Sequence, residues 1–191
     1  MPDTSPTIVL VRHGKPTMRV ASRPWQWINS HEVNRRMDAY DQASLDPHWN
    51  GPRAPRIEGH HSISSDLVRA IETAKLIVGE DPREISPLFR EVPLPRFRRN
   101  VRLPSMALVT MSRLGWFWGF MEGEESRIQT NARVREAADH LEDRVQSHRK
   151  VALFSHGFFL WLLSRELGER GWTSEKKGPF SYLETAEFLR L

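Results

Sequence analysis

Two short apolar runs constrain the fold of this chain more than any other feature. Thr7–Val11 has the sequence TIVLV and Val151–Phe154 has the sequence VALF, and neither run alternates with polar residues. A strand without alternation is typically buried on both faces, as happens in parallel sheets covered by helices on both sides. Longer segments with helical spacing lie between such runs. We therefore predict an α/β, three-layer sandwich: a mostly parallel central sheet flanked by helices.

The remaining segments differ in how strongly they indicate an element. Helical apolar spacing predicts helices over residues 66–79, 124–147 and 158–167, and weaker patterns predict helices over 32–43 and 105–114. Short strands are predicted at 63–65, 83–86 and 186–191. The helix over 124–147 is expected to bury a stripe formed by Ile128, Val134, Ala138, Leu141 and Val145. The length of 191 residues suits a single domain over 1–191.

Composition narrows the class of protein. The chain has no cysteine, which excludes disulfides, thiolate metal ligands and a cysteine nucleophile. A net charge of +4, with arginine well ahead of lysine, leaves nucleic acid, anionic lipid and a small anionic substrate open. The N-terminal residues do not resemble a signal peptide, and the longest apolar stretch, VALFSHGFFLWLL, is too short to span a membrane. We expect a cytoplasmic protein with no transmembrane segment.

A histidine followed by glycine comes directly after each apolar run. Arg12, His13 and Gly14 follow the first run, and Ser155, His156 and Gly157 follow the second. The predicted strand at 63–65 leads into a helix that carries Arg69 in its first turn. The carboxyl ends of parallel strands share one edge of a sheet, and ligands bind there. We therefore expect two histidines and two arginines to converge on one pocket.

These side chains suit phosphoryl transfer. Two arginines can hold the oxygens of a phosphoryl group and stabilise the charge that develops on them. A neutral imidazole, such as that of His13, can attack phosphorus and form a covalent intermediate. His156 can donate to an oxygen, and Gly157 leaves its backbone N–H close to the ligand. None of these steps needs a metal or a cofactor.

Five segments, taken in chain order, resemble the histidine phosphatase superfamily, also called the phosphoglycerate mutase-like family. They are LVRHGKP, ISSDLVRAIETA, LFRE, GEES and ALFSHGFFLWLL. The resemblance implies that His13 is the nucleophile and that Arg12, Arg69 and His156 hold the phosphoryl group. It also implies that Glu91 acts as general acid and then general base. Segments of about 17–62 and 92–123 would form a cap of insertions over the pocket.

The chain also departs from the family pattern. Lys15 replaces a glutamate that many members carry after R-H-G, and Thr17 is the candidate for a missing phosphate contact nearby. VPLPRFRRN stands where many members have G-x-W-E-G. If Glu91 is instead simply solvated, the remaining candidates for the acid are Glu84, Glu122 and Glu124. The physiological substrate therefore stays open.

The residues and the resemblance together predict a metal-independent phosphatase that hydrolyses a phosphate monoester through a phosphohistidine. The alternatives are a phosphoglycerate mutase-type phosphotransferase, a phosphohistidine protein phosphatase and a catalytically idle phosphate-binding domain. We expect a small phosphorylated substrate, no nucleic acid and no metal, since His48, His60 and His61 lack carboxylates at ligand spacing. The basic run at Arg96, Arg98, Arg99 and Arg102 and the aromatic cluster Trp116–Phe120 leave a peripheral membrane contact or a homodimer open.

Overall fold

The core of the structure is a five-stranded sheet with the strand order β4-β3-β6-β1-β7. The computed structural model describes residues 5–21, 23–49, 51–52, 57–121, 123–176 and 178–190. The strands are β1 (Thr7–Arg12), β3 (His61–Ser65), β4 (Glu84–Ser86), β6 (Lys150–Ser155) and β7 (Thr185–Leu189). β7 pairs antiparallel with β1, and the other neighbouring pairs are parallel. The predicted mostly parallel sheet is confirmed.

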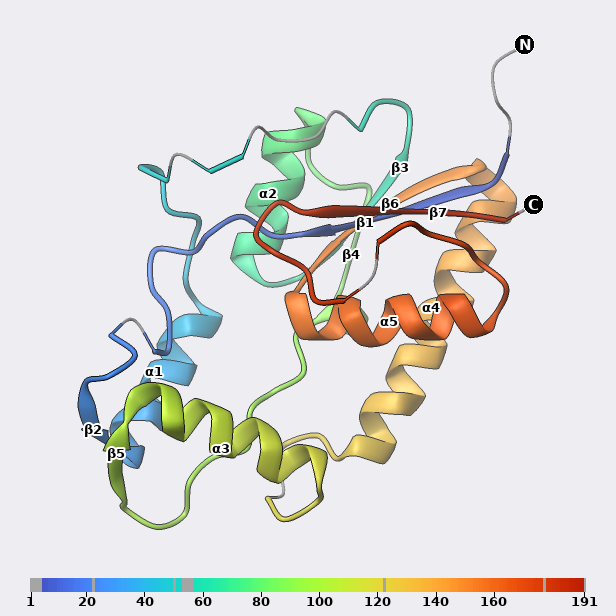
Figure 1. The fold of residues 1–191 in the computed structure, drawn as a ribbon. Coiled ribbons are helices and arrows are strands. Elements are labelled where there is room, and N and C mark those ends of the chain that lie inside the picture. Colours follow the sequence, from blue (N-terminus) through green and yellow to red (C-terminus); the bar gives the residue numbers. More distant parts are fainter. Residues whose placement is uncertain are drawn as a thin grey trace.

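Helices cover both faces of this sheet (Figure 1). In β1, Ile8 and Leu10 belong to the larger core formed with α4 (Arg127–His148) and α5 (Gly157–Glu169). Val9 and Val11 belong to the core on the opposite face, which contains Ala74 of α2 (Val68–Val78). Successive side chains of a strand point to opposite faces, so an unbroken apolar run fills both cores. The three-layer arrangement follows from that run.

A second group of elements lies beside the sheet, at the lower left of Figure 1. It contains α1 (Ser30–Asp41), α3 (Ser105–Phe117) and an antiparallel pair of short strands, β2 (Trp27–Asn29) and β5 (Arg102–Pro104). Its small core includes Ile28, Val33, Met37 and Leu108. These elements come from the segments 17–62 and 92–123, and we call them the cap. The short helix η1 (Pro87–Phe89) precedes the second of these segments.

Several predicted boundaries were wrong by a few residues, for identifiable reasons. α2 begins at Val68 because Ser65 and Asp66 still belong to the exit of β3, whereas Gly79 ends the helix in the left-handed region as its sequence suggests. α4 begins at Arg127 because Ser126 and Gln129 form a capping box. Ile128, expected on the buried stripe, is 82% exposed. It lies in the first turn of α4, ahead of Thr130, the first buried residue of the helix.

Within the described residues, no helix is both long enough and apolar enough to cross a membrane.

Candidate active site

The register between β1 and β6 places the two predicted histidines side by side. Arg12 pairs with Ser155 in the parallel ladder, and the next amide, that of His13, donates to the carbonyl of Ser155 over 2.9 Å. The ring centroids of His13 and His156 are 5.0 Å apart. Both side chains are buried, at 1% and 0% exposure. Both histidines therefore meet at the carboxyl edge of the sheet, as predicted.

The two predicted arginines lie at the same edge, each stacked on a tyrosine. Arg12 donates from Nη1 to the carbonyl of Phe180, and its guanidinium carbon lies 4.3 Å from the ring centroid of Tyr182. Arg69, in the first turn of α2, is fully buried and donates from Nη1 to the carbonyl of Tyr40 over 2.8 Å. Its guanidinium carbon lies 4.3 Å from the Tyr40 ring centroid. Stacking and carbonyl bonds hold each fork in one orientation.

Four buried nitrogen atoms in this group have no hydrogen-bond partner among the described residues. They are Arg12 Nε, Arg69 Nε, Arg69 Nη2 and His156 Nδ1. Buried polar groups are nearly always bonded, and guanidinium nitrogens are donors that cannot lose their charge. A cluster of unsatisfied donors on two fixed cations is the arrangement that an anion with several oxygens completes.

The surroundings of His13 keep its imidazole neutral. Burial lowers the pKa of His13 well below 6.5, and the nearby guanidinium of Arg69 lowers it further. Nδ1 lies 2.6 Å from the carbonyl oxygen of Gly14, which can only accept, so Nδ1 carries the proton. Nε2 then keeps a free lone pair. The Gly14 loop is held by Thr73, whose Oγ1 accepts from the Gly14 amide over 3.0 Å.

His156 has a different set of partners. Its Nε2 lies 2.9 Å from Ser65 Oγ, which also accepts from the Leu67 amide. Burial lowers the pKa of His156 well below 6.5, with His13 and then Arg69 adding to the effect. Gly157 follows at the start of α5, and a Cβ atom there would lie only 2.9 Å from Arg12 Cζ. The absence of a side chain at this position lets Arg12 pack against the helix.

Glu91 sits at the N-terminus of α5. Its Oε1 accepts from the amides of Val92 and Phe159, each over 2.9 Å, and its Oε2 accepts from the amide of Phe158 over 3.2 Å. The amides of Phe158 and Phe159 belong to the first turn of α5, which begins directly after His156, and these bonds fix the orientation of the carboxylate. Glu91 also lines a large cavity, described below. The structure thus brings this predicted residue to the site.

The other carboxylates divide clearly. Glu84 binds His61, His140 and Arg144 on the outer strand β4; burial raises its pKa, but these hydrogen bonds outweigh burial and lower it to about 2. Glu84 does not line the cavity. Glu124 does, and it pairs with Arg96 over 3.3 Å. Glu122 lies outside the described residues.

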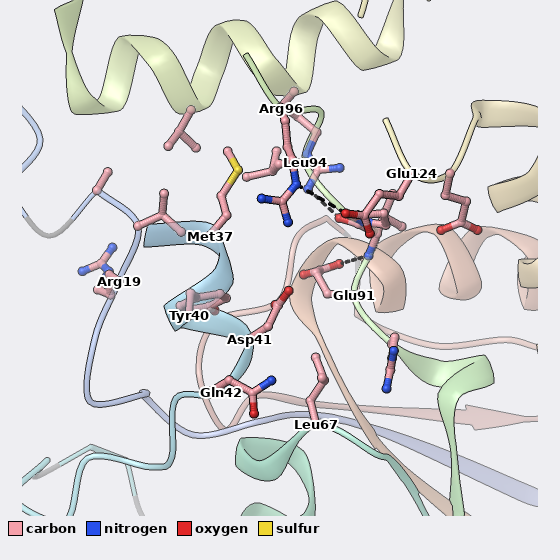
Figure 2. Close-up of a pocket in the computed structure, with 18 of the residues that line it drawn as sticks. Arg19, Met37, Tyr40, Asp41, Gln42, Leu67, Glu91, Leu94, Arg96 and Glu124 are labelled. Atoms are coloured by element: carbon pink, nitrogen blue, oxygen red, sulfur yellow. Dashed lines mark hydrogen bonds and ion pairs between the residues drawn. The ribbon is translucent and has the colours of Figure 1, made fainter. Parts of the chain in front are cut away.

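Sequence reasoning missed the carboxylate of Asp41, at the end of α1. Its Oδ1 lies 3.8 Å from Arg69 Nη2, and its side chain points toward Glu91 across the cavity (Figure 2). Its side chain is 57% exposed into that cavity, yet burial among the neighbouring groups still raises the pKa of Asp41, with Arg69 acting in the opposite direction. Nothing in the sequence around Asp41 marks it, because its place depends on how α1 packs.

A cavity of about 670 Å³ lies between the sheet edge and the cap. Its floor contains Tyr40, Asp41, Glu91 and Tyr182, which contact or neighbour the buried histidines and arginines. Burial raises the pKa of Tyr40 to about 12, so its hydroxyl stays protonated. His13, His156, Arg12 and Arg69 lie beneath this floor and do not line the cavity themselves.

Other predicted features lie away from the histidines. Thr17 is exposed, and its amide donates to the carbonyl of Ser44; its role as a phosphate contact stays a prediction. In the basic run, Arg96 lines the cavity and Arg102 lies in β5. In the aromatic cluster, Trp116 is buried, whereas Trp118 and Phe120 are 62% and 82% exposed.

Over the described residues, no group of three or more histidines or carboxylates is placed to hold a metal ion.

Comparisons with known proteins agree with the geometry. The family model described as "Histidine phosphatase superfamily (branch 1)" matches residues 8–182. No curated protein matches the sequence significantly. Because the matched range runs from β1 to Tyr182, it includes all four residues that meet at the sheet edge.

Solved structures share the fold. A mycobacterial glucosyl-3-phosphoglycerate phosphatase is 18% identical, with a TM-score of 0.54, covering 96% of this chain and 89% of its own. A functionally characterised open reading frame of Mycobacterium tuberculosis is 18% identical, with a TM-score of 0.58 and coverages of 95% and 89%. A putative alpha-ribazole-5'-P phosphatase from Escherichia coli K-12 is 15% identical, with a TM-score of 0.54 and coverages of 85% and 79%.

Proposed function

Because the chain belongs to the histidine phosphatase superfamily, we propose that it is a metal-independent phosphatase acting on a phosphate monoester through a phosphohistidine on His13. The glucosyl-3-phosphoglycerate phosphatase and putative alpha-ribazole-5'-P phosphatase among its structural neighbours fit this class. At such low sequence identity, the similarity indicates a shared fold and does not indicate a shared substrate. We therefore infer the activity from the site itself.

One observation carries the proposal: buried nitrogens of Arg12, Arg69 and His156 have no hydrogen-bond partner, and the neutral imidazole of His13 lies at the same edge of the sheet. An anion held by two guanidinium groups would satisfy those donors. A phosphate monoester has several non-bridging oxygens, whereas a carboxylate has two oxygens and suits a single fork. The adjacent lone pair on His13 Nε2 adds a nucleophile, which a site for binding alone does not need.

In the first step, Nε2 of His13 attacks phosphorus and the bond from phosphorus to the ester oxygen breaks. The guanidinium groups of Arg12 and Arg69 stabilise the charge on the non-bridging oxygens. Ser65 donates to Nε2 of His156, so that Nδ1 of His156 donates to one of those oxygens. The departing alkoxide takes a proton from a carboxylic acid on the cavity floor. We assign this role of proton donor to Glu91, and Asp41 lies beside it.

In the second step, water attacks the phosphorus of the phosphohistidine. The carboxylate that gave up its proton now accepts one from the water, and the bond from nitrogen to phosphorus breaks. His13 returns to its neutral form with Nδ1 still donating to the carbonyl of Gly14. Inorganic phosphate is released. Because His13 is only 1% exposed, the floor side chains must part to admit the ester and to release phosphate.

The first test is hydrolysis of p-nitrophenyl phosphate in excess EDTA by the wild-type protein, His13→Ala and His31→Ala. His31 is an exposed histidine on α1 and provides a matched control for the same substitution. We expect the wild type and His31→Ala to hydrolyse the ester equally and His13→Ala to fall to the background rate.

Equal rates from the wild type and His13→Ala would contradict the proposal. If neither protein hydrolyses any ester but the wild type transfers phosphoryl groups between hydroxyl compounds, the protein is a mutase-type phosphotransferase instead.

A further inference from the structure

The cavity above His13 has two chemically different ends. The floor is polar and contains the carboxyl groups of Asp41 and Glu91. In Figure 2, Met37 and Leu94 lie between these carboxyl groups and the yellow-green helix at the top, which is α3. The apolar residues that line this second end come from four separate segments: Val20, Ala21, Met37, Leu94, Met106 and Val109.

This apolar end is the open side of the cap core. Val20, Leu94 and Val109 pack against the core formed by Ile28, Val33, Met37 and Leu108, but they are only partly buried. Met106, at the start of α3, is 38% exposed. Apolar side chains left half-covered around a hollow gain free energy when an apolar group fills it.

Three of the five described arginines that line the cavity, Arg90, Arg96 and Arg133, already pair with a carboxylate. Arg96 pairs with Asp38 and Glu124, Arg90 pairs with Asp66, and Arg133 pairs with Glu125. Arg113 donates to the carbonyl of Val92. Among the described lining arginines, Arg19 and Arg113 have no carboxylate partner, and Arg113 Nη1 is a buried donor without a hydrogen bond. Paired arginines are poor attractants for a further acidic group, because their charge is already compensated.

We propose that the alcohol carried by the substrate is apolar and fills the cavity between α1 and α3 while its phosphate lies against His13. This inference rests on the proposed phosphatase function and specifies its substrate class. An ester of this kind would meet the arginines only through its phosphate. Its organic group would contact the half-covered side chains of the cap.

The test is a series of methyl, butyl and octyl phosphate, with glycerol phosphate and phosphoglycerate as polar and acidic comparators. We expect kcat/KM of the wild type to rise by roughly two- to fourfold for each methylene that enters the cavity. The value of kcat/KM for octyl phosphate should therefore be much higher than the values for glycerol phosphate and phosphoglycerate.

Two variants locate the effect. Met106→Glu places a charge in the cavity wall, and Met111→Glu is its control, since Met111 lies on the same helix, is 47% exposed and does not line the cavity. We expect Met106→Glu to lower kcat/KM for octyl phosphate about tenfold and to leave methyl phosphate unchanged. Val109→Phe, which narrows the cavity, should likewise affect the octyl ester alone.

The outcomes separate the inference from the function on which it rests. Hydrolysis of methyl phosphate with no gain along the series, or a preference for phosphoglycerate, would overturn the apolar substrate and leave the phosphatase intact. Equal losses in Met106→Glu and Met111→Glu would also overturn it. Hydrolysis of none of the esters would overturn the proposed function and this inference together.

Discussion

At the scale of single residues, Gly157 shows how the site depends on a missing side chain. An added Cβ would lie 2.9 Å from Arg12 Cζ, so Gly157→Ala must push the guanidinium aside. The side chain of Arg12 is flexible, so the fold should tolerate the shift. The shift should, however, break the hydrogen bond from Arg12 to the carbonyl of Phe180 and weaken the binding of phosphate by Arg12. We expect KM for p-nitrophenyl phosphate to rise about tenfold.

Gly168→Ala is the control, because it lies in the same helix and a Cβ there meets nothing within 4 Å. Alanine is also the better helix former by roughly 0.5–1 kcal/mol, so this variant should be slightly more stable and fully active. An unchanged KM in Gly157→Ala would show that Arg12 does not hold the phosphoryl group.

Glu91 is tested through the leaving group. Its three hydrogen bonds to backbone amides make Glu91→Gln a structural as well as a chemical change, so a drop in rate alone is ambiguous. A proton donor matters most for a poor leaving group. We therefore expect kcat to fall about 10²- to 10⁴-fold for an alkyl phosphate and much less for p-nitrophenyl phosphate.

Glu124 lines the same cavity, so Glu124→Gln is the control. It should leave the rates for both esters near those of the wild type. Equal losses with the two esters in Glu91→Gln would assign Glu91 a structural role and leave the proton to Asp41.

At the scale of elements, Glu84 ties β4 to the rest of the molecule. It accepts hydrogen bonds from His61 of β3 and from His140 and Arg144 of α4. The folded pKa of about 2 lies below the ordinary value of 4.5, so the contribution to stability is complete above that value and is lost as pH falls toward 2.

We expect Glu84→Gln to lower the free energy of unfolding by about 1–2 kcal/mol near neutral pH, after allowing for solvent screening at a quarter-exposed side chain. Urea denaturation measures this. Glu80→Gln, which removes an exposed i,i+3 pair with Arg83, should have little effect. Equal stability of Glu84→Gln and the wild type would contradict the account of this network.

The elements also show what sequence could and could not predict. β1, β6 and the helices α2, α4 and α5 were predictable because unbroken apolar runs and helical stripes are local signals. β2 and β5 were missed because each has three residues and exists only through pairing with the other. Asp41 was missed for a related reason: its position 3.8 Å from Arg69 depends on contacts between segments far apart in the chain.

At the scale of the whole molecule, burial of two histidines sets the response to pH. The pKa values of His13 and His156 lie well below 6.5, so both imidazoles stay neutral as pH falls through that value. We expect kcat/KM for p-nitrophenyl phosphate to persist below pH 6.5, because His13 remains a nucleophile. An acid limb at pH 6.5, matching an ordinary histidine, would contradict the buried site.

The same shift carries a cost in stability. The unfolded chain binds protons at these histidines below pH 6.5, whereas the folded chain does not, so the free energy of unfolding should decrease as pH falls from that value. Denaturation of the wild type and of His13→Asn across this pH range measures the effect. The free energy of unfolding should depend less steeply on pH in His13→Asn, because one buried histidine has been removed.

Trapping of the covalent intermediate would show directly whether His13 is the nucleophile. The wild-type protein is mixed rapidly with p-nitrophenyl phosphate and quenched in alkali, which preserves phosphohistidine, and its peptides are then weighed by mass spectrometry. We expect one added phosphoryl group on the peptide that contains His13, and none in His13→Ala. Turnover of the ester with the phosphoryl group on another residue, or on none, would contradict it.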